Sequence, residues 1–406
     1  MTIARLSLIA AAVLSITACG KQEPKAPEAA SAPAASVVEA APAPATEITV
    51  IKIGQAGPLT GNIAHLGKDN ENGVKMAIDE INDAGGVDIG GKKLKIEMIS
   101  EDDQADPKTA TTVAQRFVDQ KVHGIIGHLN SGTTIPASKI YNDAGIPQIS
   151  PSATAVAYTA QGFKTAFRVM ANDAQQGKVL GQFAVKNGAK KIAIIDDRTA
   201  YGQGLADEFE KAAVAAGATI VKREFTTNQE TDFNAILTGI KATKPDLIFF
   251  GGMDAQGAPL KKQAKKLGIN AIVMGGDGVQ TPEFIKLAGA DAEGMLASIP
   301  GVPTESMPGG KEFLAAYKAK FGTDVQLYAP FTYDAVKVMV GAMQKAGSAE
   351  PAKYLPELAK MEHKGITGPI VFDEKGDLKD GSVTIYAVKG GKWVMKEIVG
   401  PAPAAQ

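Results

Sequence analysis

Two kinds of apolar pattern alternate along most of the chain: short β-branched or apolar runs, and longer segments whose apolar residues recur at helical spacing. The run 48–53 ends at Gly54 and predicts a strand. The segment 69–84 predicts a helix that ends at Gly85, with one apolar face made of Val74, Ala77, Ile78 and Ile81. The pattern then repeats, and further strands are expected at 94–99, 122–127, 147–150, 191–195, 219–223, 246–251 and 271–274.

Helices are expected between these strands, opening at Pro107 and then at 134–144, 202–216, 232–242 and 258–267. Strands and helices that alternate in this way predict parallel sheets with helices on both faces. Because the alternation comes in two blocks, it predicts two Rossmann-like lobes, an α/β fold. Residues 310–346 are helical in pattern again, while 383–388 and 392–398 predict an antiparallel pair.

The first twenty residues have a different pattern. One positive charge at Arg5 precedes an apolar run, 6–16, that is too short to span a bilayer. The letters ITAC follow at 16–19: an apolar residue and two small residues before the only cysteine of the chain. This order is typical of a lipoprotein signal peptide, here 1–18, and we expect lipidation of Cys19. The alternative is an ordinary signal peptide that carries a cysteine by chance.

Residues 19–47 combine Ala, Pro and Glu with almost nothing large to bury, which predicts an extended tether. The folded part is expected from about residue 48 to 400, a length that favours two lobes over one. We expect lobe 1 to comprise 48–169 plus 299–380, and lobe 2 to comprise 170–298 plus 381–400.

Composition narrows the possible functions. The 406 residues carry a formal net charge of -1, with 21% charged and 45% hydrophobic residues. This balance argues against a nucleic-acid partner, which requires a clustered basic surface. Since the single cysteine is assigned to the anchor, no disulfide is expected within the chain. No apolar stretch after the signal peptide approaches the roughly 20 residues of a membrane helix.

The catalytic and cofactor motifs are incomplete. The segment 61–69 resembles a phosphate loop, but one residue too many separates its glycines, and Asp69 stands where Ser or Thr should follow the lysine. The segment 202–204 lacks the third glycine of a dinucleotide fingerprint, and Ser131 lacks the flanking glycines of a hydrolase elbow. The four histidines show no i, i+4 pairing. We therefore expect neither an enzyme nor a cofactor or metal site.

The loops that follow the expected strands form a coherent set, because ligands of open parallel sheets lie beyond the carboxyl ends of the strands. In the first block, the loops 128–134 and 150–154 are rich in hydroxyls, and helix N–H groups beside them suit a carboxylate. In the second block, the loop 275–278 carries one acid, Asp277. Each feature has an ordinary alternative: a helix cap, a turn or a solvated acid. Together they predict a cleft complementary to an α-amino acid zwitterion.

Several short runs carry a family resemblance: Gly-His-Leu at 127–129, Tyr-Gly-Gln-Gly-Leu-Ala at 201–206 and Asp-Glu-Lys-Gly-Asp-Leu-Lys at 373–379, together with the acidic stretch 102–108. They are collinear from Ile53 to about Asp380. In these runs the chain resembles the periplasmic leucine/isoleucine/valine-binding proteins of ABC importers. The resemblance implies two Rossmann-like lobes joined by a multi-strand hinge, the type I fold of periplasmic binding proteins.

The resemblance also implies ligand contacts, position by position. Ser131 matches the serine that holds the ligand carboxylate. Ser152, Ala153 and Thr154 match the loop that binds carboxylate and ammonium, through the backbone at Ser152 and the hydroxyl of Thr154. Tyr201 matches an aromatic residue in the first loop of the second lobe.

Three further positions depart from the leucine-binding members. Asp277 matches the acid that pairs with the ligand ammonium, but those members carry a glutamate, which is one methylene longer. Leu66 and Met253 stand where those members carry tyrosines. Both changes remove a phenol and leave a more apolar pocket wall, so the side chain of the ligand stays open.

These observations predict a lipid-anchored, periplasmic solute-binding protein. We expect it to act as a monomer, to close its lobes on an amino acid with a branched or other aliphatic side chain, and to deliver that ligand to ABC permease subunits in the membrane. The alternative is a free-standing amino-acid sensor that reports to a signalling partner. An enzyme on the same lobes would need a cofactor signature that the chain lacks.

Overall fold

The computed structural model describes residues 49–400. The predicted signal peptide, Cys19 and the tether 19–47 lie outside the described residues. Between residues 49 and 400, no helix is long and apolar enough to cross a membrane. In the same range, no group of three His, Cys, Asp or Glu side chains is arranged to hold a metal ion.

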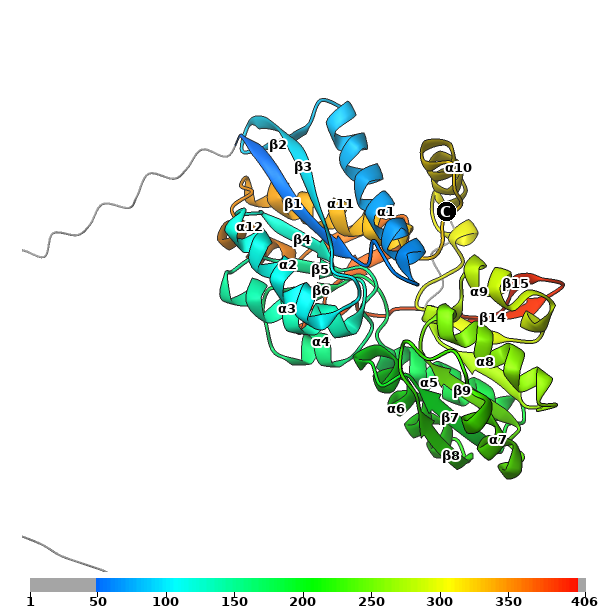
Figure 1. The fold of residues 1–406 in the computed structure, drawn as a ribbon. Helices are drawn as coiled ribbons and strands as arrows, with labels where there is room; N and C mark the ends of the chain where they lie inside the picture. Colours follow the sequence, from blue (N-terminus) through cyan, green and yellow to red (C-terminus); the bar gives the residue numbers. More distant parts are fainter. Residues whose placement is uncertain (1–48, 401–406) are drawn as a thin grey trace, which may run out of the picture. The chain divides into compact units, whose positions relative to one another are not determined.

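Lobe 1 is built on a six-stranded sheet in the order β2-β3-β1-β4-β5-β6 (Figure 1). The pairs β3–β1, β1–β4, β4–β5 and β5–β6 are parallel, whereas β2 pairs antiparallel with β3 at one edge. The central strands are apolar on both faces, as expected of a sheet covered by helices. The bounds of the strands are β1 Val50–Gly57, β2 Val87–Ile89, β3 Lys92–Asp102, β4 Gly124–Gly127, β5 Gln148–Ser150 and β6 Ala166–Arg168.

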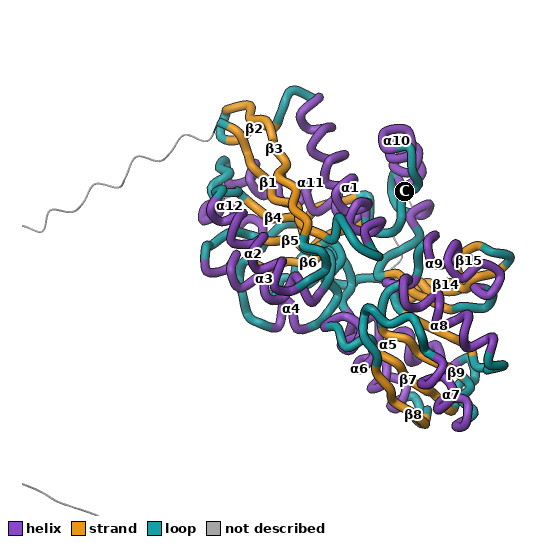
Figure 2. Tube along the Cα trace, viewed as in Figure 1, coloured by secondary structure: helices purple, strands orange, loops and turns teal. Residues whose placement is uncertain are grey.

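Helices from both ends of the described chain belong to lobe 1 (Figure 2). Most of them pack on the sheet, whereas two near the C-terminal end pack on other helices of the lobe. The bounds of the lobe 1 helices are α1 Ala64–Asp83, α2 Pro107–Asp119, α3 Ser131–Asp143, α4 Ala157–Ala160, α10 Gly310–Phe321, α11 Ala329–Ala346 and α12 Pro351–Leu358. A two-stranded ladder, β12 (Glu362–Gly365) with β13 (Gly368–Val371), follows α12. Helix α1 begins at Ala64, five residues before the predicted start at 69, because Ile63 and Leu66 are buried and bring its first turn into the core.

Lobe 2 has a seven-stranded sheet in the order β15-β14-β11-β10-β9-β7-β8. Its strands are β7 Lys191–Asp196, β8 Thr219–Phe225, β9 Leu247–Gly251, β10 Ile272–Gly275, β11 Leu296–Ile299, β14 Val383–Lys389 and β15 Lys392–Val399. The predicted antiparallel pair is confirmed as β14 with β15, and β14 joins the otherwise parallel sheet by pairing antiparallel with β11.

The helices of lobe 2 are α5 Asp173–Lys186, α6 Ala200–Ala215, α7 Asn234–Thr243, α8 Asp254–Lys266 and α9 Pro282–Ala288, with short 3-10 turns η1 Asp277–Val279 and η2 Gly289–Ala292. A third short turn, η3 Thr304–Ser306, follows β11 and packs against α10 of lobe 1. Helix α8 begins at Asp254 rather than at the predicted 258, because an acid suits the positive end of a helix and Pro259 is accommodated within it.

The two Rossmann-like lobes predicted from the sequence are confirmed, and they are joined by a multi-strand hinge. Within residues 49–400 the chain passes between the sheets three times: after β6, after β11 and before β14. Each sheet reverses its strand order next to its first parallel strand, between β1 and β4 in lobe 1 and between β7 and β9 in lobe 2. Ligands of open α/β sheets bind at such switch points, outside the carboxyl ends of the strands.

Candidate functional site

A small pocket, with an accessible volume of about 10 Å³, lies where the loops beyond the strand ends of both sheets meet. A wider cleft of about 660 Å³ shares Asn130, Tyr201 and Met253 with it and is lined by loops of both lobes. The small pocket is lined by Leu129, Asn130, Ser131, Ser152, Tyr201, Met253, Asp277 and Tyr328. It therefore brings together five of the residues predicted from the sequence: Ser131, Ser152, Tyr201, Met253 and Asp277.

The other three predicted residues are buried but do not line the small pocket. Leu66 is fully buried in the hydrophobic core. Ala153 and Thr154 are buried in the loop after β5. The Thr154 carbonyl accepts a hydrogen bond from the backbone N–H of Asp173, at 2.8 Å.

The wall contributed by lobe 1 consists of two loops that hold one another. The Ser131 hydroxyl, in the first turn of α3, accepts a hydrogen bond from the backbone N–H of Ala155 at 3.1 Å. The Ser152 hydroxyl donates to the carbonyl of Leu129 and accepts from the Asn70 amide, both at 3.2 Å. This wall therefore combines hydroxyls with the N-terminus of α3, a combination that favours an anionic group.

The wall contributed by lobe 2 is centred on Asp277, which is 1% exposed. One carboxylate oxygen accepts hydrogen bonds from the Tyr201 hydroxyl and from the Gln176 amide, both at 2.9 Å. The other accepts from the Tyr328 hydroxyl at 2.6 Å. Tyr328 is the N-cap residue of α11, which packs on α1, so this hydrogen bond joins the two lobes across the pocket.

Burial raises the pKa of Asp277, although the hydrogen bonds from Tyr328, Gln176 and Tyr201 oppose that rise. A second buried carboxyl, that of Asp173 in α5, also belongs to lobe 2. Burial and then the charge of Asp277 raise the pKa of Asp173 to about 8, so Asp173 is protonated at neutral pH. A cation placed at Asp277 would favour its charged form, which makes this wall suited to an ammonium group.

A family model described as periplasmic binding protein matches residues 50–392. The chain belongs to the periplasmic binding protein family. Members of this family are solute-binding proteins, and the family name implies a periplasmic location. A relative from Pseudomonas aeruginosa, named leucine-, isoleucine-, valine-, threonine- and alanine-binding protein, is 38% identical over 337 residues, which are 83% of this chain and 89% of the relative.

Two crystal structures of amino-acid-binding proteins are similar to the described fold. A leucine-binding protein from Thermotoga maritima matches with a TM-score of 0.81 and 30% identity, over 87% of this chain and 99% of that chain. A branched-chain amino acid transporter substrate-binding protein from Streptococcus pneumoniae, in complex with isoleucine, matches with a TM-score of 0.78 and 30% identity, over 87% and 100%.

Sequence reasoning missed three residues that line the pocket of this periplasmic binding protein and one that supports it. Leu129 and Asn130 lie in the predicted loop 128–134 but were not selected, since neither carries a charge or a hydroxyl. Gln176 supports Asp277 from α5, and Tyr328 reaches it from the start of α11. Gln176 and Tyr328 both lie at helix starts rather than in loops directly after a strand. A prediction based on the loops that follow the strands therefore does not include them.

Proposed function

We propose that this protein binds a small aliphatic α-amino acid between its two lobes and delivers it to the permease of an ABC importer. The observation that carries the proposal is the pairing of walls in one pocket. Asp277, buried and acidic, faces a wall formed by Ser131, Ser152 and the N-terminus of α3. An α-amino acid carries an ammonium and a carboxylate on one carbon, so it matches both walls at once.

The remaining lining supports an aliphatic side chain. Leu129 and Met253 contribute the apolar surface of the pocket. Methionine adapts its shape to different apolar groups. The relatives named as binding leucine, isoleucine or valine agree with this chemistry. The isoleucine complex is named as a transporter protein, which favours an importer over a sensor.

The proposal also covers the oligomeric state, the membrane anchor and the bounds of the two lobes. We expect the protein to be a monomer anchored by a lipid on Cys19, with the tether 19–47 between the anchor and the lobes. We place lobe 1 at 48–169 plus 299–380, and lobe 2 at 170–298 plus 381–400. Closure of the lobes excludes water from the pocket, which strengthens the ion pair to the ammonium.

A thermal-shift screen of the purified protein against the twenty amino acids tests the ligand class. A ligand that binds only the folded state raises the melting temperature. We expect the largest rise with leucine, isoleucine or valine. Two analogues of the best ligand serve as controls: the amide, which lacks the carboxylate, and the deaminated acid, which lacks the ammonium. Neither analogue should raise the melting temperature, and a lack of response to every amino acid would overturn the proposal.

A further inference from the structure

Arg168 is the last residue of β6 and is fully buried. All five of its N–H donors are used. Nε and Nη2 donate to one carboxylate oxygen of Asp377 at 2.9 and 2.7 Å, and Nη2 also donates to the Thr159 hydroxyl at 2.9 Å. Nη1 donates to the carbonyls of Ala153 and Ala155, at 2.7 and 2.9 Å. A guanidinium offers five donors in a fixed plane, so these partners define the position of one another.

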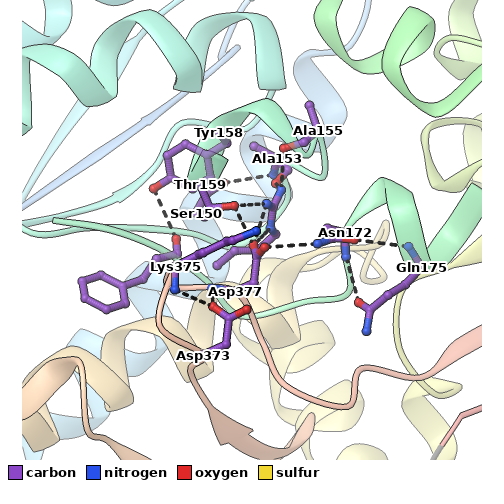
Figure 3. A network of polar contacts seen from close by, with 12 residues as sticks. Ser150, Ala153, Ala155, Tyr158, Thr159, Asn172, Gln175, Asp373, Lys375 and Asp377 are labelled. Atoms are coloured by element: carbon purple, nitrogen blue, oxygen red, sulfur yellow. Dashed lines mark hydrogen bonds and ion pairs between the residues drawn. The ribbon is translucent and has the colours of Figure 1, made fainter. Parts of the chain in front are cut away.

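Two of these partners belong to the loop that carries Thr154. The carbonyls of Ala153 and Ala155 both accept from Arg168, and the Thr154 carbonyl between them accepts from the N–H of Asp173. Three successive carbonyls are thus fixed by groups outside the pocket. Figure 3 shows Ala153 and Ala155 in the polar network that includes Asp377. The N–H groups of Ala153 and Ala155 are also used, because they donate to the Ser150 and Ser131 hydroxyls. The polar groups that this loop can offer to a ligand are then the N–H and the hydroxyl of Thr154.

The other side of the same network lies in the hinge. Asp377 precedes the third crossing between the lobes, and its second oxygen accepts from the Asn172 amide at 3.2 Å (Figure 3). Asn172 lies in the first crossing and is the N-cap residue of α5, where it forms a capping box with Gln175. The network therefore connects the ligand loop of lobe 1, through one carboxylate, to the first helix of lobe 2.

The turn that presents Asp377 is built to dock on β6. Asp373 accepts hydrogen bonds from the backbone N–H groups of Lys375 and Asp377, at 2.8 and 2.9 Å. Gly376 has a φ of +91°, and a Cβ there would lie 2.1 Å from the Ala166 carbonyl oxygen. The Gly376 carbonyl accepts from the backbone N–H of Arg168 at 2.8 Å. Only glycine fits this close approach, which accounts for the glycine in the run 373–379.

We infer that Arg168 is a positioning residue for ligand binding: it fixes the loop 153–155 from behind and, through Asp377 and Asn172, links this loop to the hinge. The inference rests on the proposed function and deepens it. A buried ion pair is weak evidence for a contribution to stability, because desolvation offsets the attraction. A network that satisfies every donor of one arginine does, however, hold the attached backbone in one arrangement.

The test compares Arg168→Lys with Arg223→Lys. Lysine keeps the charge but loses the planar fork. Arg223 is the matched control, since it also binds carboxylates, Asp196 and Asp207, at 2.9 and 2.7 Å, but lies on β8 away from the pocket. Each change is combined with Thr154→Ala in a double-mutant cycle, and affinity for leucine is measured by titration calorimetry. We expect a coupling of roughly 2- to 150-fold between Arg168 and Thr154, and additive effects for Arg223.

Amide hydrogen exchange without ligand provides a readout that does not depend on the proposed function. Arg168→Lys should speed exchange at the backbone N–H groups of residues 153–155, whereas Arg223→Lys should leave them unchanged. If wild-type protein binds no amino acid, the proposed function fails, and the exchange experiment still decides whether Arg168 fixes the loop. If Arg168→Lys lowers only the melting temperature, with loop exchange and affinity unchanged, the inference is overturned.

Thr159→Val covers the case in which Arg168→Lys does not fold. It removes one hydroxyl that bridges Arg168 and Asp377 and keeps the shape of the side chain. We expect the same changes in loop exchange and in coupling to Thr154, smaller in size. A folded Thr159→Val protein with wild-type loop exchange would overturn the inference.

Discussion

The His65 imidazole of α1 and the Asp254 carboxylate of α8 meet across the two lobes, with Nε2 2.7 Å from Oδ2. Asp254 is fully buried, and the Thr281 hydroxyl donates to the same oxygen at 2.6 Å. Three acidic groups raise the pKa of His65: Asp254 from α8, Glu283 from α9 and Asp69 from its own helix. The pair forms only when the lobes lie together, so it contributes to the closed arrangement.

The first prediction is that ligand affinity weakens as pH rises above neutrality. Burial lowers the pKa of His65, but the hydrogen bond and charge of Asp254 outweigh this effect, so the pKa lies above the ordinary value of 6.5. A raised pKa means that the contribution is fully present below about pH 6.5 and is lost as pH rises through the raised value. Because His65 is partly exposed, we expect a change of about two- to fivefold, or ~0.4–1 kcal/mol.

Calorimetric titration of the best amino acid between pH 5.5 and 8.5 checks this prediction. The control is His65→Gln, which keeps a polar side chain but cannot become charged. Other groups, Asp173 among them, titrate in both proteins, so only the difference between the two profiles belongs to His65. Parallel pH profiles for wild type and variant would contradict the prediction.

The second prediction concerns Asp173, whose pKa is raised to about 8 by burial and by Asp277. The unfolded chain releases this proton near pH 4, whereas the folded protein keeps it up to about pH 8. The folded state therefore binds more protons in this window, and stability decreases as pH rises through it. Asp173→Asn imitates the protonated acid and should stabilise the protein at pH 7 by about 1–3 kcal/mol, the usual cost of a poorly compensated buried polar group.

Denaturant unfolding at several pH values measures this effect. Asp246→Asn is the control, because the pKa of Asp246 is shifted in the opposite direction. Asp246 is exposed, and hydrogen bonds from the backbone N–H groups of Lys191 and Lys190 lower its pKa. The contribution of Asp246 is lost only as pH falls through that lowered value, so its removal should not stabilise the protein at pH 7. Equal stability of Asp173→Asn and wild type at pH 7 would show that Asp173 is not protonated there.

The sequence predicted the fold because hydrophobic periodicity is a local signal. Runs such as 48–53 and 191–195 became strands close to their expected bounds. Part of the site followed from the same signal, since Ser131, Tyr201 and Asp277 come directly after strands and line the pocket. The first residues of helices and strands were harder to predict. The first turn of α1 was not predicted, because Leu66 is buried by residues that are distant in the sequence.

Residues positioned by long-range contacts could not be predicted in this way. Tyr328 meets Asp277 from the start of a helix, 51 positions along the chain. Arg168 and Asp377 are separated by 209 positions, and each alone has the pattern of an ordinary surface charge. Neither periodicity nor strand ends distinguish such residues, because their role depends on how the hinge brings three crossings together.

The third prediction concerns the anchor, which lies outside the described residues. Cys19→Ser should abolish lipidation and leave the protein soluble or unprocessed, because a serine has no thiol to carry the lipid. Ligand affinity should stay the same, since the tether has no residues that form a core. Membrane fractionation and calorimetry of the purified variant measure the two effects. A loss of ligand binding in solution would contradict the tether hypothesis.

The fourth prediction concerns the donors of lobe 1. Ser131→Ala and Thr154→Ala should each weaken amino-acid binding by about 1–3 kcal/mol, or roughly five- to 150-fold, because a charged group enclosed on closure loses a hydrogen bond. Ser138→Ala, in the same helix as Ser131, is the control, because its hydroxyl is buried but donates to the Ile135 carbonyl at 2.7 Å, away from the pocket. Affinity and melting temperature are measured together. If all three variants lose only stability, the two residues act as structural hydrogen bonds rather than ligand contacts.

The last prediction concerns Asp277, whose carboxylate accepts hydrogen bonds from Tyr201, Gln176 and Tyr328. Asp277→Asn keeps the size but removes the charge that we propose pairs with the ligand ammonium, and breaking a buried charge pair in this way costs about 2–5 kcal/mol of binding. Asp277→Glu should be milder, because it restores the acid of the leucine-binding members, although it can change which side chain fits.

Asp334→Asn separates this effect from a general loss of stability. Asp334 is a buried acid of α11 that accepts hydrogen bonds from the backbone N–H groups of Ile366 and Thr367, at 3.0 and 2.8 Å, away from the pocket. Its replacement should lower the melting temperature without changing affinity. Calorimetric titration of all three variants with the best amino acid gives the answer. Affinity of Asp277→Asn within about twofold of wild type, ~0.4 kcal/mol, would exclude Asp277 as the partner of the ammonium, because a closed pocket cannot leave that charge unpaired at so small a cost.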